Sequence, residues 1–194
     1  MRPLILASTS PYRKIQLESL MIPFTCEKPN CDEDSFKKLE PNPLKLAILL
    51  ARKKAESLNS KNRVIIGGDQ LVNLNGKILG KPGTEEKAFI QLKEMQNQVH
   101  ELITAICVVA NDKAVEFHNV TRIKLKKLED KQIQSYLSKD TPWDCAGSYK
   151  IEKHGMALIE TLETDDFTSI QGLPLLQLSK VLHNLGYEIP KATS

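Results

Sequence analysis

The feature that most constrains the fold is a strand-to-helix junction near the start of the chain. Leu4–Ala7 is a short apolar run typical of a buried strand, and the residues Ser-Thr-Ser-Pro follow it directly. Ser10 is suited to the N-cap of a helix. Pro11 is suited to the first turn, where the missing N–H has no helical partner anyway. The sequence therefore predicts a short buried strand that leads through a hydroxyl-rich turn into a helix over about residues 11–20.

Such a junction is able to bind phosphate. The first backbone N–H groups of a helix have no partner within the helix, and the positive end of the helix dipole adds to the attraction for anions. Arg13 lies in the first turn, where its guanidinium group can add a bidentate contact to a phosphate. Serine and proline also serve as plain capping residues, so the junction alone allows both a phosphate site and an ordinary helix start.

The composition limits the classes of protein to which the chain can belong. Its 194 residues, of which 41% are hydrophobic, suffice for one large domain or two lobes with a substantial core. The 27 Lys and Arg residues against 24 Asp and Glu residues give a net charge of +3, too small to indicate nucleic-acid binding. No apolar run is long enough for a membrane helix, and no signal-peptide core follows Met1.

The cysteines have neither the spacing of a zinc site nor that of a disulfide framework. Cys26, Cys31, Cys107 and Cys145 are scattered, and we expect each to be a small buried hydrophobe. The histidines at 100, 118, 154 and 183 are equally scattered, and we assign them no catalytic role. Only His154 lies near a candidate site residue, Glu152. These features predict a soluble protein in a reducing, cytoplasmic compartment.

The rest of the chain alternates between strand and helix patterns, which indicates an α/β fold. We expect a single domain with a central crevice between two lobes. Irregular structure is expected over 27–43 and 143–150. The predicted strands are 22–26, 63–70, 99–110, 114–125 and 155–162, with a hairpin turn at 111–112, and the predicted helices are 44–58, 84–95, 130–138 and 173–186.

A second informative stretch is a buried strand that ends in two glycines and a carboxylate. Asp69 follows Gly67 and Gly68, so it lies at the carboxyl end of this strand, where open α/β sheets bind ligands. Asp69 could also be a simple turn former. Lys81 lies in a Gly-Lys-Pro-Gly turn that either presents it to a ligand or is an ordinary surface turn.

Two charged clusters could each be either part of a functional site or ordinary solvated surface. Arg52, Lys53 and Lys54 follow one another on a predicted helix, so at least one must point away from the others, and Lys54 is either solvated or turned toward an anion. The acidic run that contains Glu33 is either a solvated loop or part of a metal site.

Together these motifs resemble the Maf family of house-cleaning nucleotide pyrophosphatases, from Leu4 to beyond Pro174. The resemblance rests on Ser8-Thr9-Ser10-Pro11-x-Arg13, Glu33, Lys54-Ala55, Asp69-Gln70, Gly80-Lys81-Pro82, Ala146-Gly147-Ser148-Tyr149 and Gly172-Leu173-Pro174. It implies an inosine-triphosphatase-like α/β fold, with an elongated mixed sheet flanked by helices and two lobes around a deep substrate cleft. It also implies hydrolysis of a nucleoside triphosphate to the monophosphate and diphosphate, with a divalent cation, Mg²⁺ or Mn²⁺. Phosphoanhydride cleavage depends on positioning and charge neutralisation, which a set of cations around one polyanion supplies.

The resemblance also implies a role for each matched residue. Asp69 is expected to activate water as the base, and Glu33 is expected to be associated with the metal. The triphosphate is expected to be bound by Ser8, Ser10, Arg13, Lys54 and Lys81.

The same comparison favours one substrate branch. Gln70, the run from Cys145 to Lys150, and Glu152 are similar to the branch that hydrolyses 7-methyl-GTP, whereas dTTP and UTP enzymes carry Asp-Thr and Gln at the corresponding positions. A glutamate can accept both donors of the guanine Watson–Crick edge. Tyr12 replaces the tryptophan usual in that branch, and its weaker aromatic face predicts poorer discrimination against plain GTP.

Other functions stay open at this point. The same reaction on dTTP, UTP or another modified nucleotide is the nearest alternative. A nucleotide-binding regulator of cell division, which would bind without turnover, is a rival from a different class. We expect a small-molecule nucleotide as the partner and neither a nucleic acid nor a membrane. The sequence does not fix the oligomeric state, and a homodimer is compatible with it.

Overall fold

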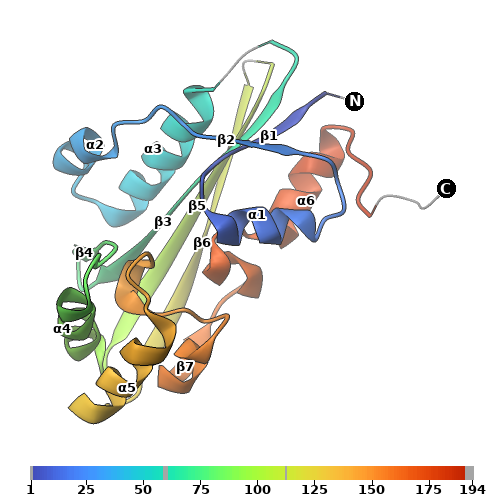
Figure 1. Ribbon diagram of the computed structural model, residues 1–194. Coiled ribbons are helices and arrows are strands. Elements are labelled where there is room, and N and C mark those ends of the chain that lie inside the picture. The colour runs from blue at the N-terminus through green and yellow to red at the C-terminus, as the bar shows by residue number, and fades with distance from the viewer. Residues whose placement is uncertain (1, 59–60, 112, 191–194) are drawn as a thin grey trace. The chain divides into compact units, whose positions relative to one another are not determined.

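The computed structural model describes residues 2–58, 61–111 and 113–190 (Figure 1). The strands are β1 (Leu4–Ala7), β2 (Thr25–Glu27), β3 (Val64–Leu74), β4 (Lys77–Leu79), β5 (Val99–Ala110), β6 (Lys113–Leu125) and β7 (Ile159–Glu163). The α-helices are α1 (Pro11–Glu18), α2 (Glu33–Leu39), α3 (Pro43–Glu56), α4 (Glu85–Met95), α5 (Asp130–Asp140) and α6 (Leu175–Asn184). Three short 3₁₀ helices complete the description: η1 (Ala146–Ser148), η2 (His154–Leu158) and η3 (Phe167–Gln171).

The strands of the described residues form one mixed sheet, and the chain divides into two compact units. The strand order is β2-β1-β3-β5-β6-β7, with β4 paired to β3. The first unit runs up to Asp69, includes Thr104–Asn119 and resumes at Asp166. The second unit consists of Gln70–Ile103 and Val120–Asp165, so β3, β5 and β6 each contribute residues to both. The predicted α/β class with a mixed sheet and flanking helices is confirmed.

In the first unit, β1 lies parallel to both β2 and β3, and its side chains alternate between the two faces of the sheet. Leu4 and Leu6 point into a core cluster that also contains Leu17 of α1 and Leu178 and Leu182 of α6. Residues of the opposite phase therefore face the other side, where α3 packs. The first unit is thus a sheet covered by α1 and α6 on one face and by α3 on the other (Figure 1).

Gly67 explains how closely α3 approaches the sheet. A Cβ atom at Gly67 would lie 2.2 Å from the carbonyl oxygen of Ala51 and 2.6 Å from the backbone nitrogen of Ala55. Both are α3 residues, so only glycine permits this contact between β3 and the backbone of α3. The sequence predicted a close approach at this glycine, and the approaching group is a helix backbone.

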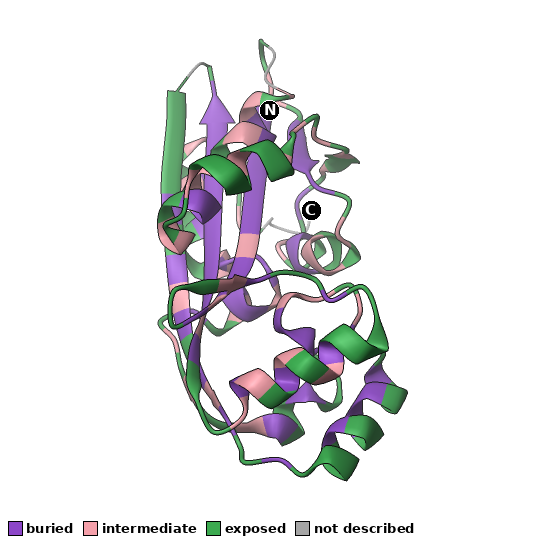
Figure 2. Ribbon diagram, turned by 90° about the vertical axis from the view of Figure 1, so that its left-hand side faces the viewer, coloured by how far each residue is buried: buried purple, intermediate pink, exposed green. Residues whose placement is uncertain are grey.

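In the second unit, two short strands extend the sheet and two helices pack together. β4 pairs antiparallel with β3, β7 pairs antiparallel with β6, and α4 packs against α5. Its core includes buried residues of both helices: Ala88, Leu92, Met95, Ile133 and Leu137. Figure 2 shows the strands largely buried, while the helices keep an exposed outer face. This half-buried pattern is what the amphipathic helical spacing predicts.

Several predicted boundaries were wrong, and the largest error lies in the predicted polar loop 27–43. That segment contains α2, whose N-cap Asp32 accepts a hydrogen bond from the backbone N–H of Ser35. Acidic residues in its first turn and lysines in its last turn complement the helix dipole. The expected strand 22–26 begins only at Thr25, after Pro23, and the expected strand 155–162 begins as η2 and becomes β7 at Ile159. The hairpin turn at 111–112 lies partly outside the described residues.

The cysteine prediction holds only in part. Cys107 is buried, as expected, but Cys26 is exposed on the short strand β2, and Cys31 and Cys145 are partly exposed. Burial of a strand residue depends on its neighbours, and β2 is an edge strand whose side chains have little cover.

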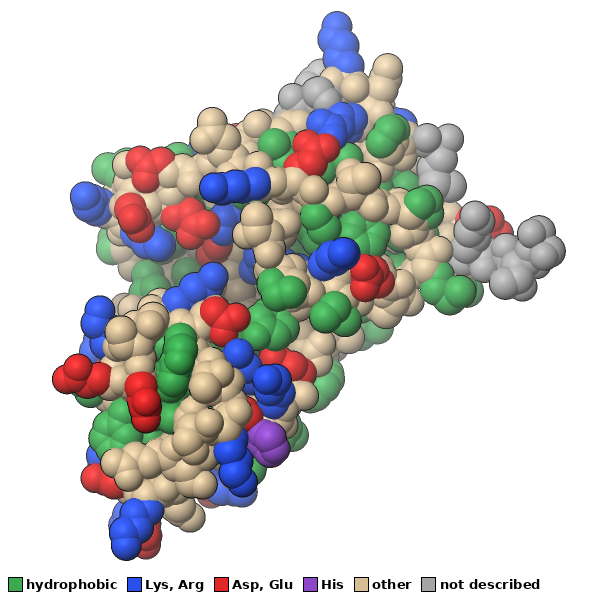
Figure 3. Space-filling model, in the orientation of Figure 1, with side chains coloured by type: hydrophobic (Ala, Val, Ile, Leu, Met, Phe, Trp, Pro, Cys, Tyr) green, Lys and Arg blue, Asp and Glu red, His purple; other side chains and the backbone are tan. Residues whose placement is uncertain are grey.

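The surface carries charges of both signs. Acidic and basic side chains are interspersed on the face drawn in Figure 3, without a large field of one sign. Among the described residues, no helix combines the length and the apolar character needed to cross a membrane.

Candidate active site

The centre of the candidate site is a buried lysine between two carboxylates. Lys54 Nζ lies 2.6 Å from Asp69 Oδ1 and 2.8 Å from Glu33 Oε1. Lys54 and Asp69 are each only 7% exposed. A buried charge needs a partner, and here three charges from three elements satisfy one another. Of the two orientations that the sequence left open for Lys54, the structure shows the inward one, whereas Arg52 is exposed and pairs with Glu56.

Local structure places these three side chains. Asp69 shares the face of β3 with Gly67, two residues earlier, and that face carries α3. Lys54 is in the last turn of α3, whose start is fixed by Asn42, the N-cap residue that accepts from the backbone N–H of Lys45. Glu33 is the first residue of α2, which contacts α3. The close approach at Gly67 therefore brings the lysine to the carboxylate.

Arg13 approaches from the other face of β3. A Cβ atom at Gly68 would lie 3.5 Å from Arg13 Nε, and that same Nε donates a hydrogen bond of 3.1 Å to the carbonyl of Gly172. Gly172 has φ +116°, and a side chain there would meet Arg13 at 3.1 Å. This contact explains the glycine of the Gly-Leu-Pro motif: it leaves room for the arginine and adopts a backbone conformation that other residues disfavour.

The end of β1 makes this arrangement possible. Ala7 pairs with Gly67, and β1 stops there, while β3 continues through Gly68 and Asp69. The carboxyl end of β1 therefore lies beside Asp69, and ligands bind at the carboxyl ends of parallel strands. The predicted end of the strand 63–70 was wrong, because β3 continues to Leu74 and keeps Asp69 within the sheet.

Burial and charge act on the two key groups in opposite directions. Burial raises the pKa of Asp69, and the nearby positive charges of Lys54 and Arg13 oppose that rise. Burial lowers the pKa of Arg13, against the negative charges of Asp69 and Glu33. Arginine stays charged in either case, so the site presents a carboxylate with raised basicity beside two fixed cations.

The hydroxyl-rich turn before α1 has the predicted capping geometry. Ser10 is the N-cap, its Oγ accepts from the backbone N–H of Arg13 at 3.4 Å, and Pro11 occupies the first turn. Ser8 is buried, and its Oγ accepts from the backbone N–H of Ser10 at 3.1 Å. Tyr12 is half-buried on the first turn of α1. Both serines thus stabilise the turn, and each hydroxyl retains a proton that can be donated to an anion.

The other predicted site residues belong to the second unit. Gln70 is its first residue and is half-buried; Lys81 and Glu152 are exposed. The structure therefore brings together Arg13, Glu33, Lys54 and Asp69 within the first unit. The roles of Gln70, Lys81 and Glu152 stay predictions that rest on the family resemblance.

Two interactions were not anticipated. Cys31 lies near the site, where burial raises the pKa of its thiol and the positive charge of Lys54 opposes that rise. In the second unit, the fully buried Asp140 accepts from both the backbone N–H and the Nδ1 atom of His154, at 3.0 and 2.5 Å. No sequence pattern pairs residues 140 and 154, and the sequence indicates only that His154 lies near Glu152.

The carboxylates of the site suit a divalent cation. No group of three or more potential protein ligands is assembled within the described ranges. Two carboxylates, Glu33 and Asp69, nevertheless approach one ammonium group, so their oxygens face a common point. One or two carboxylates completed by phosphate and water oxygens are the usual environment of Mg²⁺, so these residues fit such an ion.

Comparison with known proteins places these observations in context. Residues 3–185 match the family described as Maf-like protein. The chain is 49% identical over 183 residues to the "7-methyl-GTP pyrophosphatase" of Bdellovibrio bacteriovorus, covering 94% of this chain and 97% of that one. It is 41% identical over 187 residues to the protein of the same name from Polaromonas sp., covering 95% and 85%. A solved HAM1 protein from Coxiella burnetii shares the fold, with a TM-score of 0.51, 16% identity and coverage of 95% and 100%.

Proposed function

The chain belongs to the Maf family, and on that premise we propose that it hydrolyses 7-methyl-GTP to 7-methyl-GMP and diphosphate. Relatives that are 49% and 41% identical to it are named for this activity. The observation that carries the proposal is the cluster of Asp69, Lys54 and Glu33 beside the carboxyl end of β1, with Asp69 in the middle of β3 and Arg13 nearby.

The geometry divides the chemistry among these residues. Asp69 accepts a proton from the attacking water, and burial favours this role because it raises the pKa of the carboxyl group. The water oxygen forms the new bond to phosphorus as the phosphoanhydride bond breaks and diphosphate leaves. Arg13 and Lys54 neutralise charge on the phosphate oxygens, and Ser8 and Ser10 donate from the turn before α1.

A divalent cation, Mg²⁺ or Mn²⁺, is part of the proposal. Glu33 would hold it, with Asp69 close by, and a bound cation would neutralise charge on the phosphates and polarise them toward attack. Lys54 pairs with the same two carboxylates and keeps their oxygens turned toward one point.

Substrate selection is assigned to Tyr12, Gln70 and Glu152. Glu152 is exposed and accepts from the ring N–H and the exocyclic amine of guanine. Methylation at N7 gives the base a positive charge, which the aromatic face of Tyr12 attracts. We expect the enzyme to act in the cytoplasm, where nucleotides are made and repaired.

A nucleotide panel with diphosphate detection tests the proposal. We expect kcat/KM to be highest for 7-methyl-GTP, lower for GTP, and lowest for UTP and dTTP. A preference for UTP or dTTP would assign the chain to the alternative branch and remove the guanine-edge role from Glu152. Equal rates on 7-methyl-GTP and GTP would leave the reaction intact and remove the role of Tyr12.

The variant Asp69→Asn separates an enzyme from a nucleotide-binding regulator. We expect nucleotide binding within a few-fold of the wild-type value and a loss in kcat of about 10²–10⁴-fold, the usual contribution of a general base. Unchanged hydrolysis would exclude Asp69 from the mechanism. Tight binding without any turnover by the wild-type protein would favour the regulator.

A further inference from the structure

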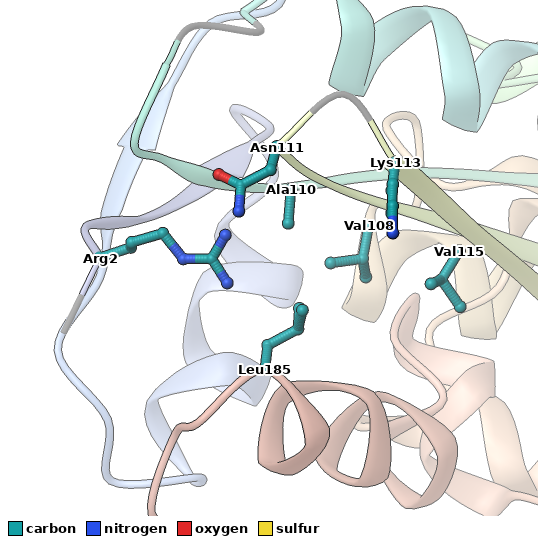
Figure 4. Close-up of a pocket in the computed structure, with 7 residues that line it drawn as sticks. All are labelled: Arg2, Val108, Ala110, Asn111, Lys113, Val115 and Leu185. Carbon is teal, nitrogen blue, oxygen red and sulfur yellow. The ribbon is translucent and has the colours of Figure 1, made fainter.

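A second pocket lies in the first unit, away from every residue assigned to catalysis. It has a volume of about 400 Å³ and is formed where the end of β5, the start of β6, the end of α6 and the N-terminal segment meet (Figure 4). Its lining consists of Arg2, Val108, Ala110, Asn111, Lys113, Val115 and Leu185. Pockets of this volume commonly hold small organic molecules.

The interior of this pocket is mainly apolar. Val108 and Ala110 are buried and belong to the core of the first unit, and Leu185 packs against that core. Val115 is 44% exposed at the side of the pocket. A ligand with an apolar body would cover these side chains and remove apolar surface from water.

Arg2 gives the pocket its specificity. Its Nη1 atom is buried and has no hydrogen-bond partner among the residues that the structure describes. In Figure 4 its guanidinium group points into the space between Asn111 and Leu185. A buried charged donor without a partner is costly, and such groups in native proteins call for an explanation.

The backbone holds Arg2 in this position. Its carbonyl accepts a hydrogen bond of 2.8 Å from the hydroxyl of the buried Tyr187, and the next carbonyl, of Pro3, accepts from the backbone N–H of Val64. The side chain therefore extends from a fixed point. A substitution of Arg2 leaves both backbone contacts intact.

The two charged side chains that line the pocket are both basic. Arg2 and Lys113 approach it from opposite sides, and the amide of Asn111 lies between them (Figure 4). None of the seven described residues that line it is acidic. An anion is therefore favoured, and the guanidinium group presents two parallel N–H donors that match a carboxylate.

We propose that this pocket binds an organic carboxylate with an apolar body, such as a medium-chain fatty acid or an aryl carboxylate. The carboxylate pairs with the guanidinium group of Arg2, and the apolar body covers Val108, Val115 and Leu185. Lys113 adds charge at the opening. This binding is independent of the nucleotide reaction, because the pocket and the catalytic cluster share no residue.

The test is a titration of the full-length protein with octanoate, followed by amide chemical shifts and by calorimetry. We expect octanoate to bind and to shift the resonances of Val108, Val115 and Leu185. Octanol lacks the charge, octylamine reverses it, and acetate and inorganic phosphate lack the apolar body, so each should bind at least about tenfold more weakly. Equal binding of octanol would overturn the proposal, as would tighter binding of phosphate.

Two variants locate the site. Arg2→Met keeps the apolar stem and both backbone contacts but removes the charge, and it should weaken octanoate binding at least about tenfold. Val115→Glu places a negative charge beside the ligand at an exposed position, where it does not disturb the core, and it should have the same effect. Arg122→Met, an identical change at an exposed arginine of the second unit, is the matched control and should bind normally.

The outcomes are distinct from those of the nucleotide assays. Octanoate binding that is unchanged in both pocket variants, or that shifts Lys54 and Asp69 instead, would overturn the proposal. Absence of octanoate binding to the wild-type protein would do the same. Hydrolysis of 7-methyl-GTP by both pocket variants should match the wild-type rate when no octanoate is present.

Discussion

At the scale of single residues, the proposed mechanism depends on the protonation of Asp69. The carboxyl group must be ionised to accept a proton, and burial raises its pKa while Lys54 opposes the rise. The native state therefore keeps this proton to higher pH than the unfolded chain does. Folding stability contributed by this group falls as pH rises from the ordinary pKa of an aspartate through the raised one.

The acid limb of the pH–rate profile tests this argument. We expect kcat/KM to decline with falling pH at a midpoint above 3.8, the ordinary value for aspartate. Lys54→Met removes the charge that lowers the pKa of Asp69, so the midpoint should move to still higher pH. Lys53→Met, one residue away and partly exposed, is the control and should leave the midpoint in place. A midpoint that does not move in Lys54→Met would separate Lys54 electrostatically from the base.

The residue types of this cluster could be predicted, but their geometry could not. The helix cap formed by Ser10 followed from a local rule and is confirmed. The prediction that Asp69 ends its strand was wrong, because β3 continues to Leu74, although Asp69 does lie beside the end of β1. Which of three consecutive basic residues turns inward depends on the rotation of α3 about its axis. That rotation is set by the contact at Gly67, which local sequence does not encode.

At the scale of elements, the packing of α3 on β3 depends on one missing side chain. Gly67→Ala places a methyl group 2.2 Å from the carbonyl of Ala51, so the helix must move away. We expect a loss of more than about 2 kcal/mol in the free energy of unfolding, measured by urea denaturation, and a reduced kcat because Lys54 moves with the helix. Gly80→Ala, which meets nothing within 4 Å, should change stability by less than about 0.5 kcal/mol. Equal effects of both changes would refute this account of the interface.

The segment that carries Glu152 is anchored on α5. Asp140 is fully buried and accepts two hydrogen bonds from His154, and the carbonyl of Lys150 accepts from the backbone N–H of Gly155. Glu152 thus lies on a short segment that is fixed at both ends.

Removal of the imidazole tests this anchor. His154→Ala leaves the buried carboxylate of Asp140 with fewer donors, and we expect a loss of about 1–3 kcal/mol in unfolding free energy. His118→Ala, at an exposed position of β6, is the control and should have little effect. Thermal denaturation of the two variants in parallel makes the comparison, and equal midpoints would show that Asp140 does not depend on His154.

Elements with strong periodicity were predictable, and short ones were not. The strand over 99–110 was predicted to the residue because a long apolar run has few alternatives. Helix α2 was missed because seven mostly polar residues carry a weak periodic signal. Its caps were visible: Asp32 and the acids that follow it, then two lysines near the end, form the charge pattern of a helix.

At the scale of the whole molecule, the family resemblance assigns a role in triphosphate binding to Lys81, a residue of the second unit. Lys81→Ala should raise the KM for 7-methyl-GTP about tenfold to a hundredfold, the effect of losing one charge-assisted contact to phosphate. Lys87→Ala, at another exposed lysine of the second unit, is the matched control. The KM of both variants for 7-methyl-GTP is measured by steady-state kinetics. Equal KM values would show that Lys81 is an ordinary surface residue.

The hydrogen bond from Arg13 to the carbonyl of Gly172 has a consequence for biosynthesis. It joins positions 159 residues apart in the chain. A ribosome therefore exposes Arg13 long before it has translated the loop whose carbonyl orients the guanidinium group. During synthesis Arg13 lacks this hydrogen bond until Gly172 has emerged, so the proposed phosphate site is completed only after that loop has been made.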